Sequence, residues 1–162
     1  MRFLLDKIES LSGKCEIYSI TFENENCLYE KFIQEYLNTC HDELHEINNR
    51  IATIGKITGI KDWYFSNPAP GYIPKGEDCI LHEEENSFLR LHTIKLASSL
   101  VILTGYLRKP HPTHQDVPGY VESKLSLIEQ ISISIKDALY DNTLTESNVG
   151  LKSKTQFIYE FK

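Results

Sequence analysis

The spacing of apolar positions in the first part of the chain predicts one strand followed by two helices. Side chains of residues 15–22 alternate between two faces, as they do along a β-strand. In residues 29–54 the apolar residues recur at intervals of three and four, which is the spacing of one face of a helix. Asn38 or Thr39 breaks this register and divides the stretch into two helices, and Gly59 stands where the second helix is expected to end.

Shorter apolar runs in the second part predict an antiparallel meander of three strands and a last helix. The strands are expected at residues 79–84, 88–95 and 100–107, because short turns separate these runs. Asp116 is suited to cap the helix that follows, and Pro118 to begin it.

These elements predict one α+β domain of 162 residues, a length that supports one core. Its expected order is an N-terminal strand, a helix pair, the meander and a C-terminal helix. We divide the chain into a strand region at 1–28, a core at 29–140 and a loose tail at 141–162. Within that tail, residues 155–161 are expected to add an edge strand.

Composition favours a cytoplasmic protein without a structural metal. No stretch approaches the roughly 20 apolar residues of a membrane span, and the start of the chain lacks the apolar centre of a signal peptide. The four cysteines are far apart and form no CxxC pair, so we expect free thiols. We predict no cofactor, no membrane partner and no direct contact with DNA.

Charge is distributed unevenly along the chain. The net charge is −6, yet residues 86–115 contain no Asp or Glu, where an even spread would place about four. The same stretch holds four Lys or Arg residues, so its local charge is +4 and the remainder sums to −10. Two interpretations stay open. The stretch either forms a surface that faces an anion, or it lacks acids because buried strands exclude them.

The second strand of the meander carries the first candidate site residues. Arg90 and His92 share one face, because side chains alternate along a strand. Leu89 and Leu91 point the other way and are expected to face the helices, which leaves Arg90 and His92 on an open sheet face. Lys95 is close to the next turn, where the alternation can shift, so its side stays undecided.

The third strand and the residues after it supply four more candidates. Tyr106 and Arg108 are two residues apart, so they are expected on the same face of the strand. Lys109 and His111 follow the end of the strand. Together with Arg90, His92 and Lys95 they predict a cluster of cations, imidazoles and one phenol.

Such a cluster suits cleavage of RNA by its own 2′-hydroxyl group. A base removes the hydroxyl proton, cations stabilise the charged phosphorane, and an acid protonates the leaving oxygen. We assign catalytic roles to Arg90, His92, Arg108 and Lys109, and substrate binding to Lys95, Tyr106 and His111. The alternative for each residue is a purely structural role.

A second constellation suggests a metal site. His41 and His45 are four residues apart on the second predicted helix, a spacing that presents both rings on one face. No third ligand is identifiable, so a solvated helix face is favoured. His111 and His114 form another pair, in a loop, and nothing in the sequence fixes them.

Residues 61–78 predict a long loop, because they contain three prolines and two glycines. The aromatic residues Trp63 and Phe65 lie in it. We expect them either to cover the edge of the core or to carry a function.

The sequence of the meander also resembles a known family. Residues 88–95 read Phe-Leu-Arg-Leu-His-Thr-Ile-Lys, and residues 100–109 read Leu-Val-Ile-Leu-Thr-Gly-Tyr-Leu-Arg-Lys. Together with the order of the predicted elements, this resembles the RelE/ParE superfamily of bacterial toxins, particularly its RelE- and HigB-like branch. In that branch a Leu-Arg strand is followed by a hydrophobic strand that ends in Gly-aromatic-x-Lys-Lys.

The resemblance implies a toxin that cleaves mRNA in the ribosomal A site without a metal ion and that a cognate antitoxin neutralises. Arg90 matches the strand arginine of the family, Arg108 and Lys109 its basic pair, and Lys95 lies near a second basic position. The chain departs from the family in three respects: it is longer, it is acidic overall, and it has only four arginines. A non-catalytic binding protein on the same fold is therefore the alternative, and a metal-dependent enzyme that uses His41 and His45 is a third hypothesis.

Overall fold

A computed structural model describes residues 2–65, 79–80, 89–107, 119–147, 150–154 and 159–160. The strands are β1 (Arg2–Lys7), β2 (Glu16–Phe22), β3 (Cys79–Ile80), β4 (Leu89–Lys95), β5 (Ser99–Leu107), β6 (Leu144–Ser147), β7 (Gly150–Ser153) and β8 (Tyr159–Glu160). The α-helices are α1 (Leu28–Tyr36), α2 (His41–Thr53) and α3 (Tyr120–Tyr140). Short 3-10 turns occur at Glu9–Leu11 and Asp62–Tyr64, and a π-helical turn at Ile54–Thr58 extends α2.

A six-stranded mixed sheet forms the centre of the fold, with the order β3-β4-β5-β2-β1-β8. The expected meander is confirmed, since β3, β4 and β5 are neighbours and run antiparallel. β2 pairs with β5 in parallel, and β1 continues the sheet as the antiparallel neighbour of β2. The α+β class is therefore correct, and the sheet is larger than the sequence predicted.

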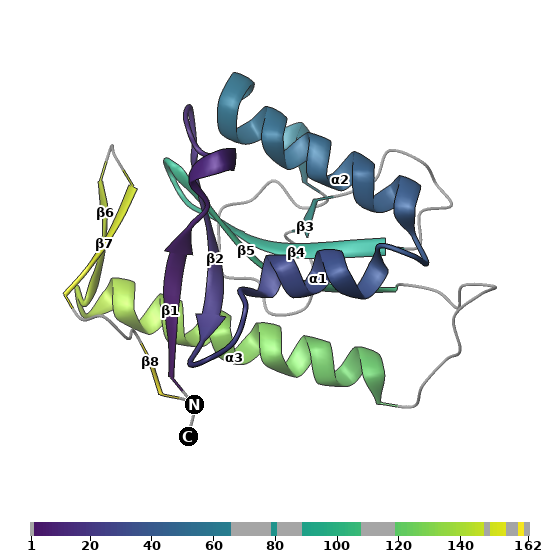
Figure 1. Cartoon of the computed structure of the whole chain (residues 1–162). Coiled ribbons are helices and arrows are strands. Elements are labelled where there is room, and N and C mark those ends of the chain that lie inside the picture. The colour runs from purple at the N-terminus through teal and green to yellow at the C-terminus, as the bar shows by residue number, and fades with distance from the viewer. Residues whose placement is uncertain are drawn as a thin grey trace.

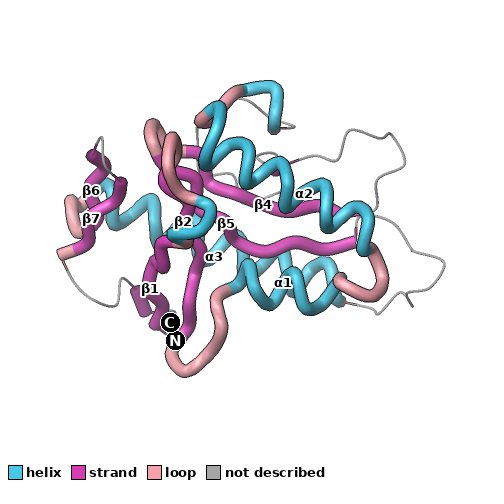
Figure 2. The backbone as a smooth tube through the Cα atoms, turned by 45° about the horizontal axis from the view of Figure 1, so that its top comes forward, coloured by secondary structure: helices cyan, strands magenta, loops and turns pink. Residues whose placement is uncertain are grey.

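Helices cover both faces of the sheet, as Figures 1 and 2 show. α1 and α2 pack on one face, where Phe32 and Tyr36 of α1 share a core with Leu91 and Ile102 of the sheet. α3 packs on the opposite face and buries isoleucines against other sheet residues. That second core contains Ile94, Val101 and Leu103 from the sheet and Ile128, Ile131 and Ile135 from α3.

A buried serine links the parallel strands to the first helix. Ser19 on β2 is fully buried, and its Oγ donates to the carbonyl oxygen of Ile102 on β5 at 3.0 Å. The same Oγ accepts a hydrogen bond from the backbone N–H of Tyr29 at 3.1 Å. One hydroxyl group thus satisfies both a strand carbonyl and one of the N–H groups that lack an intrahelical acceptor at the start of α1.

The two helices end as the sequence predicted. α1 ends at Tyr36 and α2 begins at His41, so the break includes Asn38 and Thr39. Gly59 ends the π-helical turn with φ = 72°, a left-handed backbone that glycine adopts without steric cost. Asp116 and Pro118, expected to start the last helix, lie outside the described residues, and α3 follows Gly119 at φ = 80°.

Near both ends of the chain there are strands that the sequence did not predict, namely β1 at the start and β6 and β7 in the tail. β1 was not expected, and β8 lies along its outer edge (Figure 1). Arg2 is paired with Glu160 in this ladder. β8 lies within residues 155–161, where an edge strand was expected. The tail after Asp141 also holds the β6–β7 hairpin, which donates from Leu151 N–H to the Tyr18 hydroxyl at 2.9 Å.

Candidate functional site

β4 places Arg90 and His92 on the same face of the sheet, as its alternation predicted. Leu89 and Leu91 point into the core beneath α1 and α2, as expected, and Ile94 lies on the α3 side. Arg90 and His92 have the same parity as Ile94, so they share the face that α3 covers.

A β-bulge in β5 brings Tyr106 to this face. Leu91 pairs with Gly105 and Thr93 with Ile102, so β5 has one extra residue opposite His92. Without this extra residue, Tyr106 would share the side of Ile102 and point toward α1 and α2. With it, Tyr106 lies directly opposite Arg90, and its ring centroid is 5.1 Å from that of His92. The three residues form one group, which we call the Arg90–His92–Tyr106 cluster.

Gly105 allows the strands and the first helix to approach closely at this cluster. A Cβ atom at position 105 would overlap the carbonyl oxygen of Arg90 and lie 2.5 Å from Cε2 of Phe32. Glycine is therefore required between the cluster and α1.

The expectation that Arg90 and His92 lie on an open sheet face is wrong for His92. His92 is 1% exposed and Tyr106 is 7% exposed, while Arg90 is half-buried. The face is not solvated, because α3 packs its isoleucines against Ile94, Val101 and Leu103 farther along the same side of the sheet. The periodic pattern of α3 does not reveal which part of the sheet this helix covers.

Burial controls the protonation of His92. Burial, and to a smaller extent the positive charge of Arg90, lower the pKa of His92 to about 4. At neutral pH the ring is therefore neutral. One ring nitrogen carries a hydrogen and can donate a hydrogen bond, and the other can accept a hydrogen bond or a proton.

Three nitrogen atoms of the cluster have no hydrogen-bond partner within the described part of the chain. They are both ring nitrogens of His92 and Nε of Arg90. Buried polar atoms are usually hydrogen-bonded, so such orphans require an explanation. A bound anionic or polar group would supply acceptors for Arg90 and a partner for the imidazole.

The structure separates Lys95 from this cluster, which settles the side that the sequence left undecided. Lys95 faces the α1–α2 layer and is 6% exposed, with Nζ 5.2 Å from the centre of the Phe65 ring. The sheet lies between Lys95 and Arg90. Arg108, Lys109 and His111 follow the end of β5 and lie outside the described residues.

The other candidate residues have simple surroundings. His41 and His45 lie on the exposed side of α2 with parallel rings, 6.3 Å between centroids. Among the residues that the structure describes, no three His, Cys, Asp or Glu side chains come together in a way that would hold a metal ion. His114 lies outside the described residues.

The two aromatic residues of the 61–78 loop differ in their burial. Phe65 is buried and joins the core beneath α2, which confirms that it covers the edge of the core. Trp63 is 74% exposed and does not contribute to that core. Residues 66–78 lie outside the described part of the chain.

Sequence reasoning missed one surface feature, a pocket between α1 and α2. Six residues line it: Ile33, Leu37, His41, Leu44, His45 and Asn48. The sequence carries no clear signal for it, because Leu37 belongs to the periodic apolar pattern of residues 29–54, which predicts burial, whereas the structure leaves it 46% exposed.

No helix in the described residues is both long enough and apolar enough to cross a membrane. Comparisons with models of protein families, with curated proteins and with solved structures find no match.

Proposed function

We propose that this protein is a RelE-like toxin that cleaves mRNA without using a metal ion and that a cognate antitoxin protein binds it. One observation carries the proposal: Arg90, His92 and Tyr106 are brought together, with orphaned nitrogen atoms on Arg90 and His92. The order of elements supports it as well, because a helix pair, an antiparallel meander and a helix follow each other as the resemblance implies.

The protonation of His92 suggests its role in such a reaction. A neutral imidazole accepts a proton, so His92 takes the proton from the 2′-hydroxyl group of the RNA as that oxygen attacks the phosphorus atom. The bond from phosphorus to the 5′-oxygen breaks, which leaves a 2′,3′-cyclic phosphate and a 5′-hydroxyl end.

The cations have the complementary roles. Arg90 donates hydrogen bonds to the phosphorane oxygens, where negative charge accumulates. A second group must return a proton to the 5′-oxygen, and we assign this step to Lys109, with Arg108 beside it as a further cation. Lys95, on the other face, is left out of the chemistry that this proposal describes.

Burial of the cluster favours a second candidate, a binding protein without catalytic activity on the same fold. A phosphodiester must come within about 3 Å of the catalytic base, and His92 is 1% exposed. Cleavage therefore requires the ring to become accessible when RNA or the ribosome binds. A protein that only binds a partner does not need this change.

Controlled expression in a bacterial host separates the two candidates. The toxin proposal expects growth and translation to stop on induction, and Arg90→Ala to restore both. Arg50→Ala is the matched control, because Arg50 lies on α2 and away from the cluster. Unimpaired growth on expression of the folded wild-type protein would contradict the toxin proposal and support the binding candidate.

A further inference from the structure

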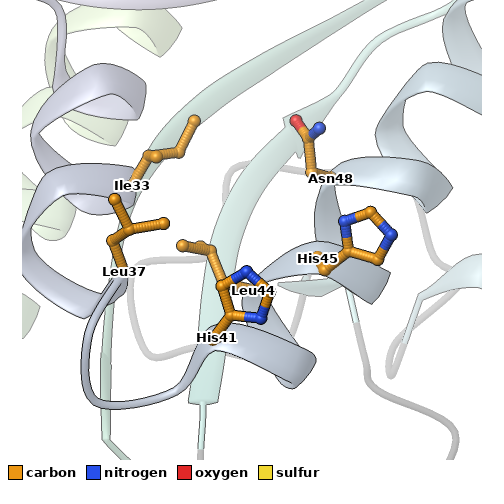
Figure 3. Close-up of a pocket in the computed structure, with 6 residues that line it drawn as sticks. All are labelled: Ile33, Leu37, His41, Leu44, His45 and Asn48. Carbon is orange, nitrogen blue, oxygen red and sulfur yellow. The ribbon is translucent and has the colours of Figure 1, made fainter.

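The pocket between α1 and α2 lies on the surface that faces away from the Arg90–His92–Tyr106 cluster. Figure 3 shows Ile33 of α1, and Leu37 just after its end, on the side facing Leu44, with the two histidine rings and Asn48 along α2. Its six lining residues, given above, define what we call the α1–α2 groove. The sheet separates this groove from the cluster, since α1 and α2 pack on the opposite face from α3.

A hydrogen bond within the protein links the two helices beside the groove. The hydroxyl group of Tyr29 on α1 donates to Oδ1 of Asn48 on α2, which ties the two helices together at one end of the groove. At the other end, Leu37 is 46% exposed beside the buried Leu44. An apolar surface that is already formed needs little rearrangement to bind a partner.

The size of the pocket points to a side chain as its occupant. Its volume is about 130 Å³. Sites for drug-sized ligands and cofactors measure roughly 300–1,000 Å³, so this pocket is too small for them. One aliphatic side chain of a partner protein, acting as an anchor, is the occupant that matches its size and apolar lining.

The charge around the groove indicates what surrounds that anchor. The stretch from α1 to α2, residues 28–53, has five acidic side chains and two basic ones, a net charge of −3. Glu35 is already engaged by Tyr120 and Lys124, and Glu43 by the N–H of Leu89. Glu30, Asp42 and Glu46 have exposed side chains, and Oδ1 of Asp42 lies 3.4 Å from Nδ1 of His41.

We infer that the α1–α2 groove binds a basic amphipathic helix of a partner protein. A helix fits because α2 returns alongside α1 (Figure 1), and the furrow between two such helices accepts the apolar ridge of a third. An aliphatic residue of that helix fills the pocket beside Leu37. Its Lys or Arg residues lie near Asp42 and Glu30.

Synthetic peptides of defined charge test this inference. Three helical peptides of equal length are titrated into the full-length protein and followed by NMR: a Leu/Lys amphipathic peptide, a Leu/Glu peptide with the same leucine positions, and a Ser/Lys peptide that lacks the leucines. We expect only the Leu/Lys peptide to bind tightly, with the largest shifts at Ile33, Leu37 and Leu44.

Variants separate docking from general attraction to an acidic protein. Leu37→Ser should weaken binding of the Leu/Lys peptide about tenfold, and Asp42→Lys should weaken it severalfold. Ile133→Ser is the control, since Ile133 on α3 is 49% exposed and lies outside the groove. Equal binding of the Leu/Glu or Ser/Lys peptide, equal loss in Ile133→Ser, or shifts away from the groove would overturn the inference.

This inference does not depend on the ribonuclease proposal. Arg90→Ala is expected to leave peptide binding unchanged, because the sheet lies between the two sites. If the wild-type protein binds the Leu/Lys peptide but does not cleave mRNA, the ribonuclease proposal has failed. If it cleaves mRNA but does not bind the peptide, the inference about the groove has failed.

Discussion

His92 is a titratable ring inside the protein, so its protonation is linked to stability. The pKa in the folded protein is lowered from 6.5 to about 4, so the unfolded chain binds this proton more tightly. The stability that depends on the neutral ring is complete above about pH 6.5 and is lost as the pH falls toward 4.

A variant that cannot titrate isolates this effect. His92→Phe keeps a ring in the buried position and should resist acid better than the wild type. The free energies of unfolding should diverge as the pH falls from 6.5, by at most about 3 kcal/mol at pH 4. Chemical denaturation at several pH values measures the gap, with His45→Gln as the exposed control. A gap that does not change with pH would mean that His92 is not buried in its neutral form.

Gly105 is a residue-scale requirement of a different kind. A methyl group there would overlap the Arg90 carbonyl and approach the Phe32 ring, so Gly105→Ala should destabilise the fold by about 1–3 kcal/mol. Gly59→Ala is the comparison. Its left-handed backbone strains an alanine, but no atom lies within 4 Å of the added methyl group, so this variant has the backbone cost without the steric overlap. Thermal unfolding of both variants checks this. If Gly105→Ala unfolded like the wild type, the close approach of β4, β5 and α1 would be wrong.

At the scale of elements, the C-terminal hairpin is attached to the sheet by identifiable hydrogen bonds. Glu146 accepts from the N–H of Ala97, and Ser98 Oγ donates to the carbonyl of Ser147 at 2.8 Å. Leu151 N–H donates to the Tyr18 hydroxyl. β6 and β7 are therefore held against β2 and the β4–β5 turn.

Tyr18→Phe should loosen this hairpin and leave the sheet intact. The variant leaves the N–H of Leu151 without its acceptor, at a cost of about 1 kcal/mol. Amide hydrogen exchange should become faster at Leu151 and stay slow in β5. Tyr140→Phe is the control, since the Tyr140 side chain is 91% exposed. Unchanged exchange at Leu151 would show that the hydroxyl does not hold the hairpin.

The sequence allowed the prediction of elements whose periodic pattern is strong. The repeats of α1 and α2, the alternation of β2 and the runs of the meander each reflect a face buried along the whole element. β1, β6 and β7 were missed because none of them buries a whole face: Phe3 is the buried residue of β1, Leu144 that of β6 and Gly150 that of β7. Without a row of buried apolar residues, alternation leaves little trace in the sequence.

The candidate site could be predicted only in part, for a related reason. Alternation along β4 was enough to place Arg90 beside His92. The position of Tyr106 depends on the bulge opposite His92, which is a property of two paired strands. Burial of the cluster depends on what packs on this face of the sheet, which strand alternation does not reveal.

For the whole molecule, the central sheet separates two surfaces with different chemistry. The α3 face contains Arg90 and His92 within a stretch of the chain that has no acidic residue. The other face carries α1 and α2, with the α1–α2 groove between them and a net charge of −3 over residues 28–53. Under the two proposals, a protein with a net charge of −6 presents a cation to RNA on one side and acidic residues to a basic partner on the other.

Cleavage of an end-labelled mRNA in a purified translation system, with chelator present, tests the central claim most directly. We expect the wild-type protein to produce fragments with 2′,3′-cyclic phosphate ends. Arg90→Ala should reduce the rate at least a hundredfold, because it removes charge stabilisation of the phosphorane, and Arg50→Ala should not. Intact mRNA with the folded wild-type protein, or equal cleavage by Arg90→Ala, would contradict the account.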